Sequence, residues 1–310
     1  MKRFGRELQA LEGLTLVLTH SLADLDACAS AIVLADAIHA EARCPDKPTA
    51  AARHCLERLG LEIKQYNKEK FDNLILVDVS TESLLGGVNP SFFKRVLVVD
   101  HHYHNKRVKS NYAFIDAKRS SCAELIVEAC NELNFQLTEK WKKLLLAGII
   151  HDTAWFKSAD SRSLGVVADL CKELDFQEVL GIARVHRDAA MVKVIKEGIG
   201  NAEIIELNKH LIGFTRVKAF ELHTASTLVD AGCDYAFALD GKAGKMSGVK
   251  KAGSPGSIGK AMEAIGRAFE GNGGGHNSVG GAMGKPENAE AALKEAKKQM
   301  ELLLLDNDNL

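Results

Sequence analysis

The sequence has no long hydrophobic run, no C-x-x-C pair and only five prolines among its 310 residues. It begins with the charged segment MKRFGRELQALEG, so we expect neither a signal peptide nor a membrane span. The seven cysteines are odd in number and lie mostly in apolar helical patterns, which predicts buried thiols in a reducing compartment. These absences predict a cytoplasmic protein that does not bind membranes.

A charge excess is also missing from the chain as a whole. The net formal charge is -1 and the pI is about 6.8, which argues against a protein that coats long nucleic acid with a general basic surface. Residues 241–300 carry ten Lys or Arg against five Glu and no Asp, a local excess of +5. This segment is either a modest anion-binding face or a solvated basic helix, and charge alone does not decide between them.

What the chain does have is four apolar runs that end in acidic residues or histidines. They cover residues 14–27, 74–80, 95–102 and 144–153. The first three resemble buried parallel strands that deliver polar groups to the carboxyl edge of a sheet. Ligand sites in open α/β sheets gather at that edge. The fourth run is typical of an amphipathic helix, capped by Thr138 and ending near Asp152.

Strand and helix patterns alternate up to about residue 185, which predicts an α/β fold with a mainly parallel sheet covered on both faces. We assign the first domain to residues 1–185. In residues 186–209, apolar and polar residues alternate with helical periodicity and no partner strand is close in sequence, which predicts a linker helix. Residues 210–310 have two apolar strands, a glycine-rich region and two helices, enough for a smaller α/β domain.

Charge crowding at the sheet edge predicts a metal site. Two unit charges about 4 Å apart repel by roughly 4 kcal/mol at an effective dielectric near 20, so several converging carboxylates are unstable alone. Protonation would relieve one or two of these pairs, but interleaved histidines favour divalent cations held by imidazole and carboxylate together. Two metals roughly 3.5–4 Å apart have room for a bridging carboxylate. The candidate ligands are His20, Asp24, Asp26, Asp78, His101 and Asp152.

Taken singly, these motifs have ordinary structural explanations. Asp24 and Asp26 lie on a strand-to-helix turn, where an acidic N-cap is the common alternative, and Asp78 alone is typical of a turn residue after a strand. Trp155 and Phe156 follow the fourth run, and they either stack a terminal base or belong to the core. The metal hypothesis therefore depends on the whole set of residues.

The segment Asp100-His101-His102 is more specific than the others. Adjacent residues at the end of a strand point to opposite sides, so they can serve different roles. His101 is then placed to bind metal while His102 faces a substrate phosphate. Asp100 is expected to orient an imidazole, as metal-binding histidines usually require.

Together these motifs resemble a known family. HSLADLDA, LVDVS, VVDHH and GIIHDTAWF are similar to the four successive motifs of the DHH phosphoesterases. NGGGHNSVGGA (272–282) resembles the GGGH signature of the C-terminal domain found in the RecJ and nanoRNase branches. The resemblance implies two metals that share Asp78, with manganese preferred and magnesium possible. It places one metal on His20, Asp24 and Asp78 and the other on Asp26, Asp78, His101 and Asp152.

The C-terminal signature predicts a substrate grip. Gly273, Gly274 and Gly275 lack side chains, so their amides can approach a phosphate, and His276 adds a donor, although a bare glycine triplet is also typical of a flexible surface loop. Relatives commonly carry an Arg near the serine that precedes this loop, whereas this chain has Val249 there. The phosphate-binding candidates are therefore Ser247 with Lys250 or Lys251, where Lys provides a point charge in place of a bidentate fork.

The resemblance implies a manganese-dependent phosphodiesterase that removes nucleotides from an end of single-stranded DNA, RNA or short oligonucleotides. It also implies that residues 1–185 form the catalytic domain, that residues 210–310 form a substrate-binding domain, and that the active-site cleft lies between them. Two other hypotheses stay open: a hydrolase of cyclic di-AMP or 3'-phosphoadenosine phosphate, and an inactive replication or repair scaffold. Expected partners are nucleic acid, a repair or replication protein, and further copies of the same chain.

Overall fold

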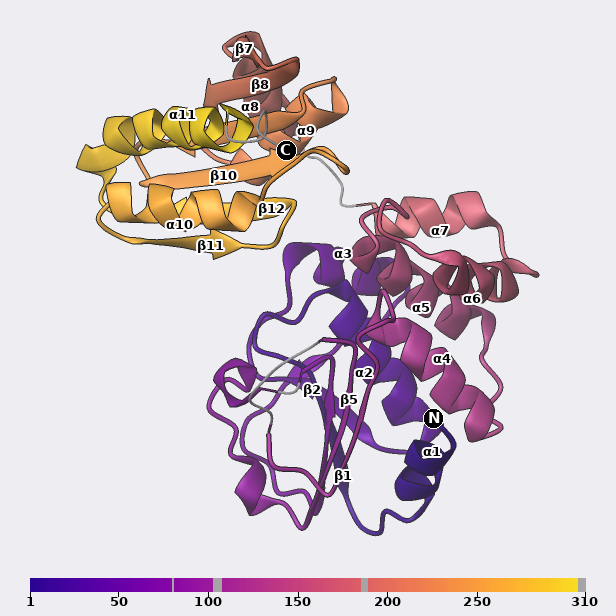
Figure 1. Cartoon of the computed structure of the whole chain (residues 1–310). Coiled ribbons are helices and arrows are strands. Elements are labelled where there is room, and N and C mark those ends of the chain that lie inside the picture. Colours follow the sequence, from indigo (N-terminus) through magenta and orange to yellow (C-terminus); the bar gives the residue numbers. More distant parts are fainter. Residues whose placement is uncertain (80, 103–107, 185–188, 306–310) are drawn as a thin grey trace. The chain divides into compact units, whose positions relative to one another are not determined.

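The computed structural model describes the whole chain except residues 80, 103–107, 185–188 and 306–310 (Figure 1). The chain folds into two compact units, Met1–His186 and Arg187–Leu310. Within the described residues, the helices lack the combination of length and apolar character that a membrane crossing needs.

The N-terminal unit contains a six-stranded sheet in the order β3-β2-β1-β4-β5-β6. Every neighbouring pair in this sheet is parallel, in agreement with the α/β prediction. Parallel strands bring their carboxyl ends to one edge, where the apolar runs stop. The strands are β1 Thr15–Leu18, β2 Glu41–Cys44, β3 Lys64–Gln65, β4 Asn73–Val77, β5 Arg95–Asp100 and β6 Tyr112–Ile115.

Helices cover one face of this sheet and loops cover the other. On the helical face, alternate residues such as Val17, Ile75 and Val99 join the main core. The opposite face, with residues such as Leu16 and Leu74, packs under loop side chains. The prediction of a sheet covered on both faces is met, although among the described residues the second cover lacks α-helices. The helices are α1 Lys2–Gln9, α2 Leu25–Ala37, α3 Ala50–Arg58, α4 Cys122–Glu132, α5 Glu139–Asp152, α6 Ser161–Cys171 and α7 Phe176–Ala183.

Side-chain caps begin the helices that carry the candidate site. The Asp24 carboxylate accepts a hydrogen bond from the backbone N–H of Ala27 at 3.0 Å and starts α2. Thr138 caps α5 as predicted, through a 3.4 Å bond from the N–H of Trp141. Most residues of α2 are buried and many are Ala, Cys or Ser, so α4 and α5 can pack closely against it.

The C-terminal unit contains a mixed sheet in the order β11-β12-β10-β9-β8-β7. Only the β8–β9 pair is parallel; the other pairs of this sheet are antiparallel. The elements are α8 Ala189–Gly200, β7 Glu203–Leu207, β8 His210–Arg216, α9 Glu221–Asp230, β9 Tyr235–Asp240, β10 Lys245–Lys250, α10 Ile258–Ala268, β11 Asn272–Gly275, β12 Val279–Met283 and α11 Ala289–Leu305.

The predicted linker helix over residues 186–209 is wrong in its second half, and residues 186–188 lie outside the described part. The helix α8 ends at Gly200, and β7 follows and pairs antiparallel with β8. Asn208 and Lys209 have φ values of 47° and 65°, so they form a tight two-residue hairpin turn. The β-branched pair Ile204-Ile205 and this turn were the signals of a strand hairpin.

Glycines let α10 lie directly against the edge strand β11. A Cβ atom on Gly273 would stand 1.9 Å from the carbonyl oxygen of Met262, and one on Gly266 would stand 2.4 Å from the backbone N of Gly273. A Cβ on Gly274 would meet nothing within 4 Å. The glycine triplet therefore combines a packing position with an open one.

We predict that alanine destabilises the C-terminal unit at Gly273 and has little effect on its stability at Gly274. Gly273→Ala forces the helix away from the strand and should lower the free energy of unfolding of the C-terminal unit by about 1–3 kcal/mol. Gly274→Ala is the matched control and should change it by less than about 0.5 kcal/mol. Urea unfolding of the full chain followed by circular dichroism measures both, and equal stability of the two variants would contradict the packing argument.

Candidate metal centre

All six predicted metal ligands lie at the carboxyl edge of the N-terminal sheet. His20 follows β1, Asp78 follows β4, and His101 follows β5. The start of α2 supplies Asp24 and Asp26, and Asp152 is the last residue of α5. Strand ends and helix ends from five elements therefore meet at one place.

Asp78 lies at the middle of the cluster. Its Oδ2 is 3.5 Å from His20 Nε2, and its Oδ1 is 3.3 Å from His101 Nε2. His101 Nε2 is also 3.3 Å from Asp152 Oδ2. Three groups have ligand atoms within 4.8 Å of one another: His20 with Asp24 and Asp78, Asp78 with His101 and His102, and Asp26 with His101 and Asp152.

Asp78 reaches this position through an uncommon backbone conformation. Its φ is 60°, in the left-handed region, directly after the last residue of β4. Asp tolerates this region better than most residues with a side chain. The residue is 4% exposed, so the turn places a charge inside the unit.

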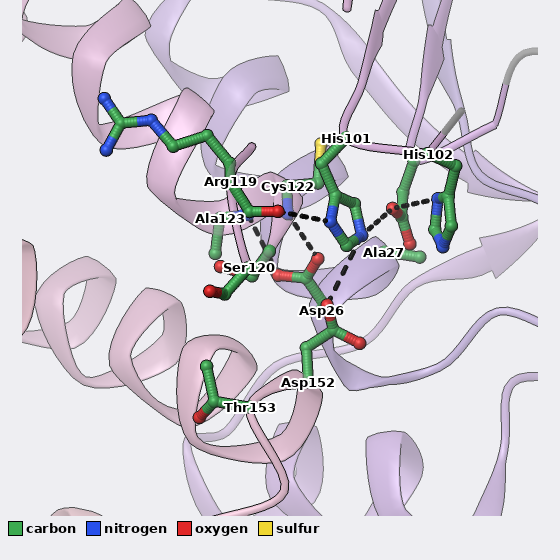
Figure 2. A network of polar contacts seen from close by, with 12 residues as sticks. Asp26, Ala27, His101, His102, Arg119, Ser120, Cys122, Ala123, Asp152 and Thr153 are labelled. Atoms are coloured by element: carbon green, nitrogen blue, oxygen red, sulfur yellow. Dashed lines mark hydrogen bonds and ion pairs between the residues drawn. The ribbon is translucent and has the colours of Figure 1, made fainter. Parts of the chain in front are cut away.

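Two buried ligand atoms lie 3.3 Å apart and make no regular hydrogen bond to any other group among the described residues. These are Nε2 of His101 and Oδ1 of Asp78. The Nδ1–H of His101 donates to the carbonyl oxygen of Arg119 at 3.2 Å (Figure 2), which leaves Nε2 directed at Asp78 and Asp152. Imidazole nitrogen and carboxylate oxygen together suit Mn²⁺ or Mg²⁺, so the residues present fit a divalent cation.

The charges also shift the acid–base properties of these groups. Burial favours the neutral form of His101, but hydrogen bonding to Asp78 and the charges of Asp26 and Asp152 outweigh it and raise the pKa of His101 to about 10. Burial raises the pKa of Asp152 to about 7 and raises that of Asp26 as well. Burial also disfavours charged Asp78, but hydrogen bonds from His101 and His20 lower its pKa to about 2. Without cations, protons compensate part of the negative charge.

Asp26 has a structural task that the sequence reasoning missed. Its Oδ2 accepts from the N–H of Cys122 at 2.7 Å and its Oδ1 from the N–H of Ala123 at 2.9 Å (Figure 2). These N–H groups are in the first turn of α4, where the helix dipole favours an anion. The S-x-x-E capping pattern of Ser121 and Glu124 was the available signal for this helix start.

Asp100 orients His102. One carboxylate oxygen of Asp100 accepts from the backbone N–H of His102 at 3.0 Å and contacts its Nδ1 at 2.9 Å. This hydrogen bond raises the pKa of His102. Asp100 is fully buried, while the His102 side chain is 44% exposed. Asp100 thus contacts the imidazole of His102, whereas the Nδ1 of the candidate ligand His101 bonds to the carbonyl oxygen of Arg119.

In the C-terminal unit, Ser247 lies across from Gly281 on β12, and Gly281 lies across from Gly274 on β11. Three successive strands thus present small residues in one row. His276 is exposed in the turn between β11 and β12, and its backbone N–H donates to the carbonyl oxygen of Val279 at 2.8 Å. Gly275 has a φ of 145°, which suits glycine at the end of β11.

The two predicted phosphate-binding lysines have different surroundings, because Lys250 is buried and Lys251 is exposed. Lys250 is buried, and its Nζ donates to the carbonyl oxygens of Ser254 and Gly256 at 2.6 Å each. Lys251 Nζ is 3.8 Å from a carboxylate oxygen of Asp234. Lys245, which the sequence reasoning missed, is exposed two residues before Ser247 on β10, and strand alternation would have placed both side chains on one face.

We predict that cation binding releases protons. His101, with a pKa of about 10, is protonated at pH 7, and Asp152 is about half protonated, whereas a metal needs both groups deprotonated. The affinity for Mn²⁺ should rise between pH 6 and pH 8, by roughly tenfold per unit for each proton displaced. Titration calorimetry in buffers of different ionisation enthalpy counts these protons, and pH-independent binding without proton release would refute the arrangement.

Comparisons with known proteins identify relatives by sequence and by fold. Residues 15–149 match the family model described as "DHH family, N-terminal domain". The chain is 26% identical over 302 residues to an uncharacterized protein of Methanocaldococcus jannaschii, covering 93% of this chain and 92% of that one.

Two solved structures show the same fold. An exopolyphosphatase-related protein from Bacteroides fragilis has a TM-score of 0.77 at 12% identity, with 97% of this chain and 96% of that chain covered. RecJ from Thermus thermophilus, solved with Mn²⁺, has a TM-score of 0.61 at 14% identity, with 96% of this chain and 54% of RecJ covered. Residues 15–149 therefore carry the N-terminal domain of the DHH family, and the chain has a RecJ-like fold.

Proposed function

We propose that this protein is a manganese-dependent phosphodiesterase that removes nucleotides from an end of single-stranded nucleic acid or short oligonucleotides. The observation that carries the proposal is the buried carboxylate of Asp78, which belongs to two of the three candidate ligand groups. A shared carboxylate is the feature that a two-metal phosphoesterase needs. Similar folds solved as "exonuclease RecJ bound to manganese" and as RecJ with Mg²⁺ support the choice of reaction and metal.

In this proposal one metal would be held by His20, Asp24 and Asp78. The other would be held by Asp26, Asp78, His101 and Asp152, so that Asp78 serves both. Bound there, two divalent cations would bring the pKa of a water molecule toward neutrality and offset charge on the phosphate.

The residues around the ligands have their own tasks in this proposal. His102 presents an exposed imidazole whose raised pKa favours the charged form, so it can donate a hydrogen bond to a phosphate oxygen in the transition state. Asp100 keeps that ring in place from a buried position. Arg119 holds His101 through its carbonyl oxygen. The buried carboxylates need no solvent reorganisation during the reaction, which is the usual advantage of a preorganised site.

In the C-terminal unit, the row of Ser247, Gly281 and Gly274 has room for a sugar-phosphate backbone, because its largest side chain is a hydroxymethyl group. His276 and Lys245 are exposed near this row and supply hydrogen-bond donors. The net charge of -1 gives little non-specific attraction for long polyanions. This combination favours short substrates or chain ends.

The function is tested with single-stranded DNA and RNA labelled at the 5' or 3' end, a duplex, cyclic di-AMP and 3'-phosphoadenosine phosphate. We expect manganese-dependent release of nucleotides from single strands, poor cleavage of duplex, loss of activity in EDTA and recovery with Mn²⁺. Cleavage of only cyclic di-AMP or 3'-phosphoadenosine phosphate would favour a hydrolase specific for one of these small molecules. Mn²⁺ binding without any hydrolysis would favour the scaffold.

Asp78→Asn provides the matched inactive variant. Asn also tolerates a positive φ, so the turn after β4 should be preserved and the circular dichroism spectrum unchanged. Loss of the shared charge should lower kcat by at least about a hundredfold, since even the partners of metal ligands are worth 10–100-fold. Activity within a few fold of the original protein would refute the shared role of Asp78.

We predict that His276→Ala and Lys245→Ala each raise KM for an oligonucleotide about tenfold, with kcat changed less, because both act in substrate binding. Lys294→Ala, which removes the same charge from the exposed surface of α11, is the control. Equal KM values for Lys245→Ala and Lys294→Ala would remove Lys245 from the substrate surface.

A further inference from the structure

The turn that follows the metal ligand Asp152 is strained. Ala154, Trp155 and Phe156 have φ values of 48°, 61° and 65°, three successive left-handed residues without a glycine. Each left-handed position is unfavourable for a residue with a Cβ, and such strain persists at functional sites where the surroundings enforce it.

Backbone and core contacts hold this turn. The N–H of Trp155 donates to the carbonyl oxygen of Ile150 at 2.8 Å. The hydroxyl of Thr153 donates to the carbonyl oxygen of Ile149 at 2.6 Å and accepts from the N–H of Phe156 at 3.2 Å. These bonds continue from α5, so the turn is fixed to the helix that carries Asp152.

The turn sends its two aromatic side chains to different environments. Phe156 packs against the main core, with its ring centroid 6.1 Å from that of Phe176. Trp155 remains 41% exposed, and the guanidinium of Arg184 lies 5.7 Å from its ring centroid. A folding argument accounts for Phe156, but it leaves an exposed indole with a neighbouring cation unexplained.

We propose that Trp155 is a stacking platform for a base of the substrate and that Arg184 pairs with a phosphate of the same nucleotide. Trp155 is the third residue after Asp152, at most about 11 Å away along the backbone, so one nucleotide can span both groups. An exposed indole beside a guanidinium combines base stacking with phosphate pairing. Stacking requires an unpaired base, so the platform selects single strands. This proposal rests on the proposed function.

The two tryptophans of the chain allow a direct binding test. Trp141, whose indole N–H donates to a carboxylate oxygen of Asp36 at 2.8 Å, lies at the other end of α5 and provides the control. In Trp141→Phe, which keeps only Trp155, AMP with Mg²⁺ should quench the fluorescence, whereas ribose 5-phosphate should not. In Trp155→Phe, which keeps only Trp141, neither should change it. Quenching of Trp141 alone, or of neither tryptophan, would overturn the platform.

Kinetics separate the platform from general substrate binding. Trp155→Ala should raise KM about tenfold for an adenine dinucleotide and leave KM unchanged for the same backbone with tetrahydrofuran in place of both bases. Trp155→Phe should recover most of the loss, because a phenyl ring still stacks. Arg184→Gln should raise KM on both substrates. Equal effects of Trp155→Ala on both would overturn the assignment to the base.

The two proposals fail in distinguishable ways. Hydrolysis of oligonucleotides by a protein whose Trp155 variants behave normally, with no AMP quenching, removes the platform and leaves the phosphodiesterase. Quenching of Trp155 by AMP in a protein that hydrolyses no nucleic acid keeps the base site and removes the proposed reaction.

Discussion

The crowding of buried carboxylates around Asp78 is the constraint on which the N-terminal unit depends. Asp26, Asp78 and Asp100 are nearly or fully buried, where an uncompensated charge is strongly unfavourable. Each has a specific partner: the first turn of α4 for Asp26, the imidazoles of His20 and His101 for Asp78, and His102 for Asp100. The remaining repulsion is what divalent cations, or protons in their absence, are suited to balance.

This constraint explains features that otherwise look unrelated. Gly148 lets α5 approach α2, since a Cβ there would lie 3.2 Å from a carboxylate oxygen of Asp26. The left-handed turn at Asp78 and the strained turn after Asp152 both follow directly from elements that deliver ligands. In the described part of the N-terminal unit, four of the seven non-glycine residues with positive φ, Asp78 and 154–156, are candidate metal ligands or follow one closely. The sheet itself has regular parallel register.

In the C-terminal unit, close backbone packing takes the place of buried charge as the main constraint. Its edge strand is built from glycine, some of it needed for close helix packing at Gly273 and some of it open at Gly274. The arginine expected near Ser247 is replaced by Val249, which is buried in a small core with Val279 as its paired residue on β12. Lys245 lies on the same face of β10 as Ser247 and Val249. It therefore supplies a positive charge from that strand, two residues before Ser247.

The sequence alone determined the α/β class, the mainly parallel character of the N-terminal sheet and the six ligand candidates, because apolar runs that end in Asp or His indicate strand ends. Only the tertiary structure decided the tasks of individual side chains. Asp26 accepts a hydrogen bond from the start of α4, 96 residues away in the sequence. Lys250 donates hydrogen bonds to two carbonyl oxygens, and β7 forms where a helix was predicted. These outcomes depend on which backbone donors and acceptors meet in space, and residue type and spacing do not contain that information.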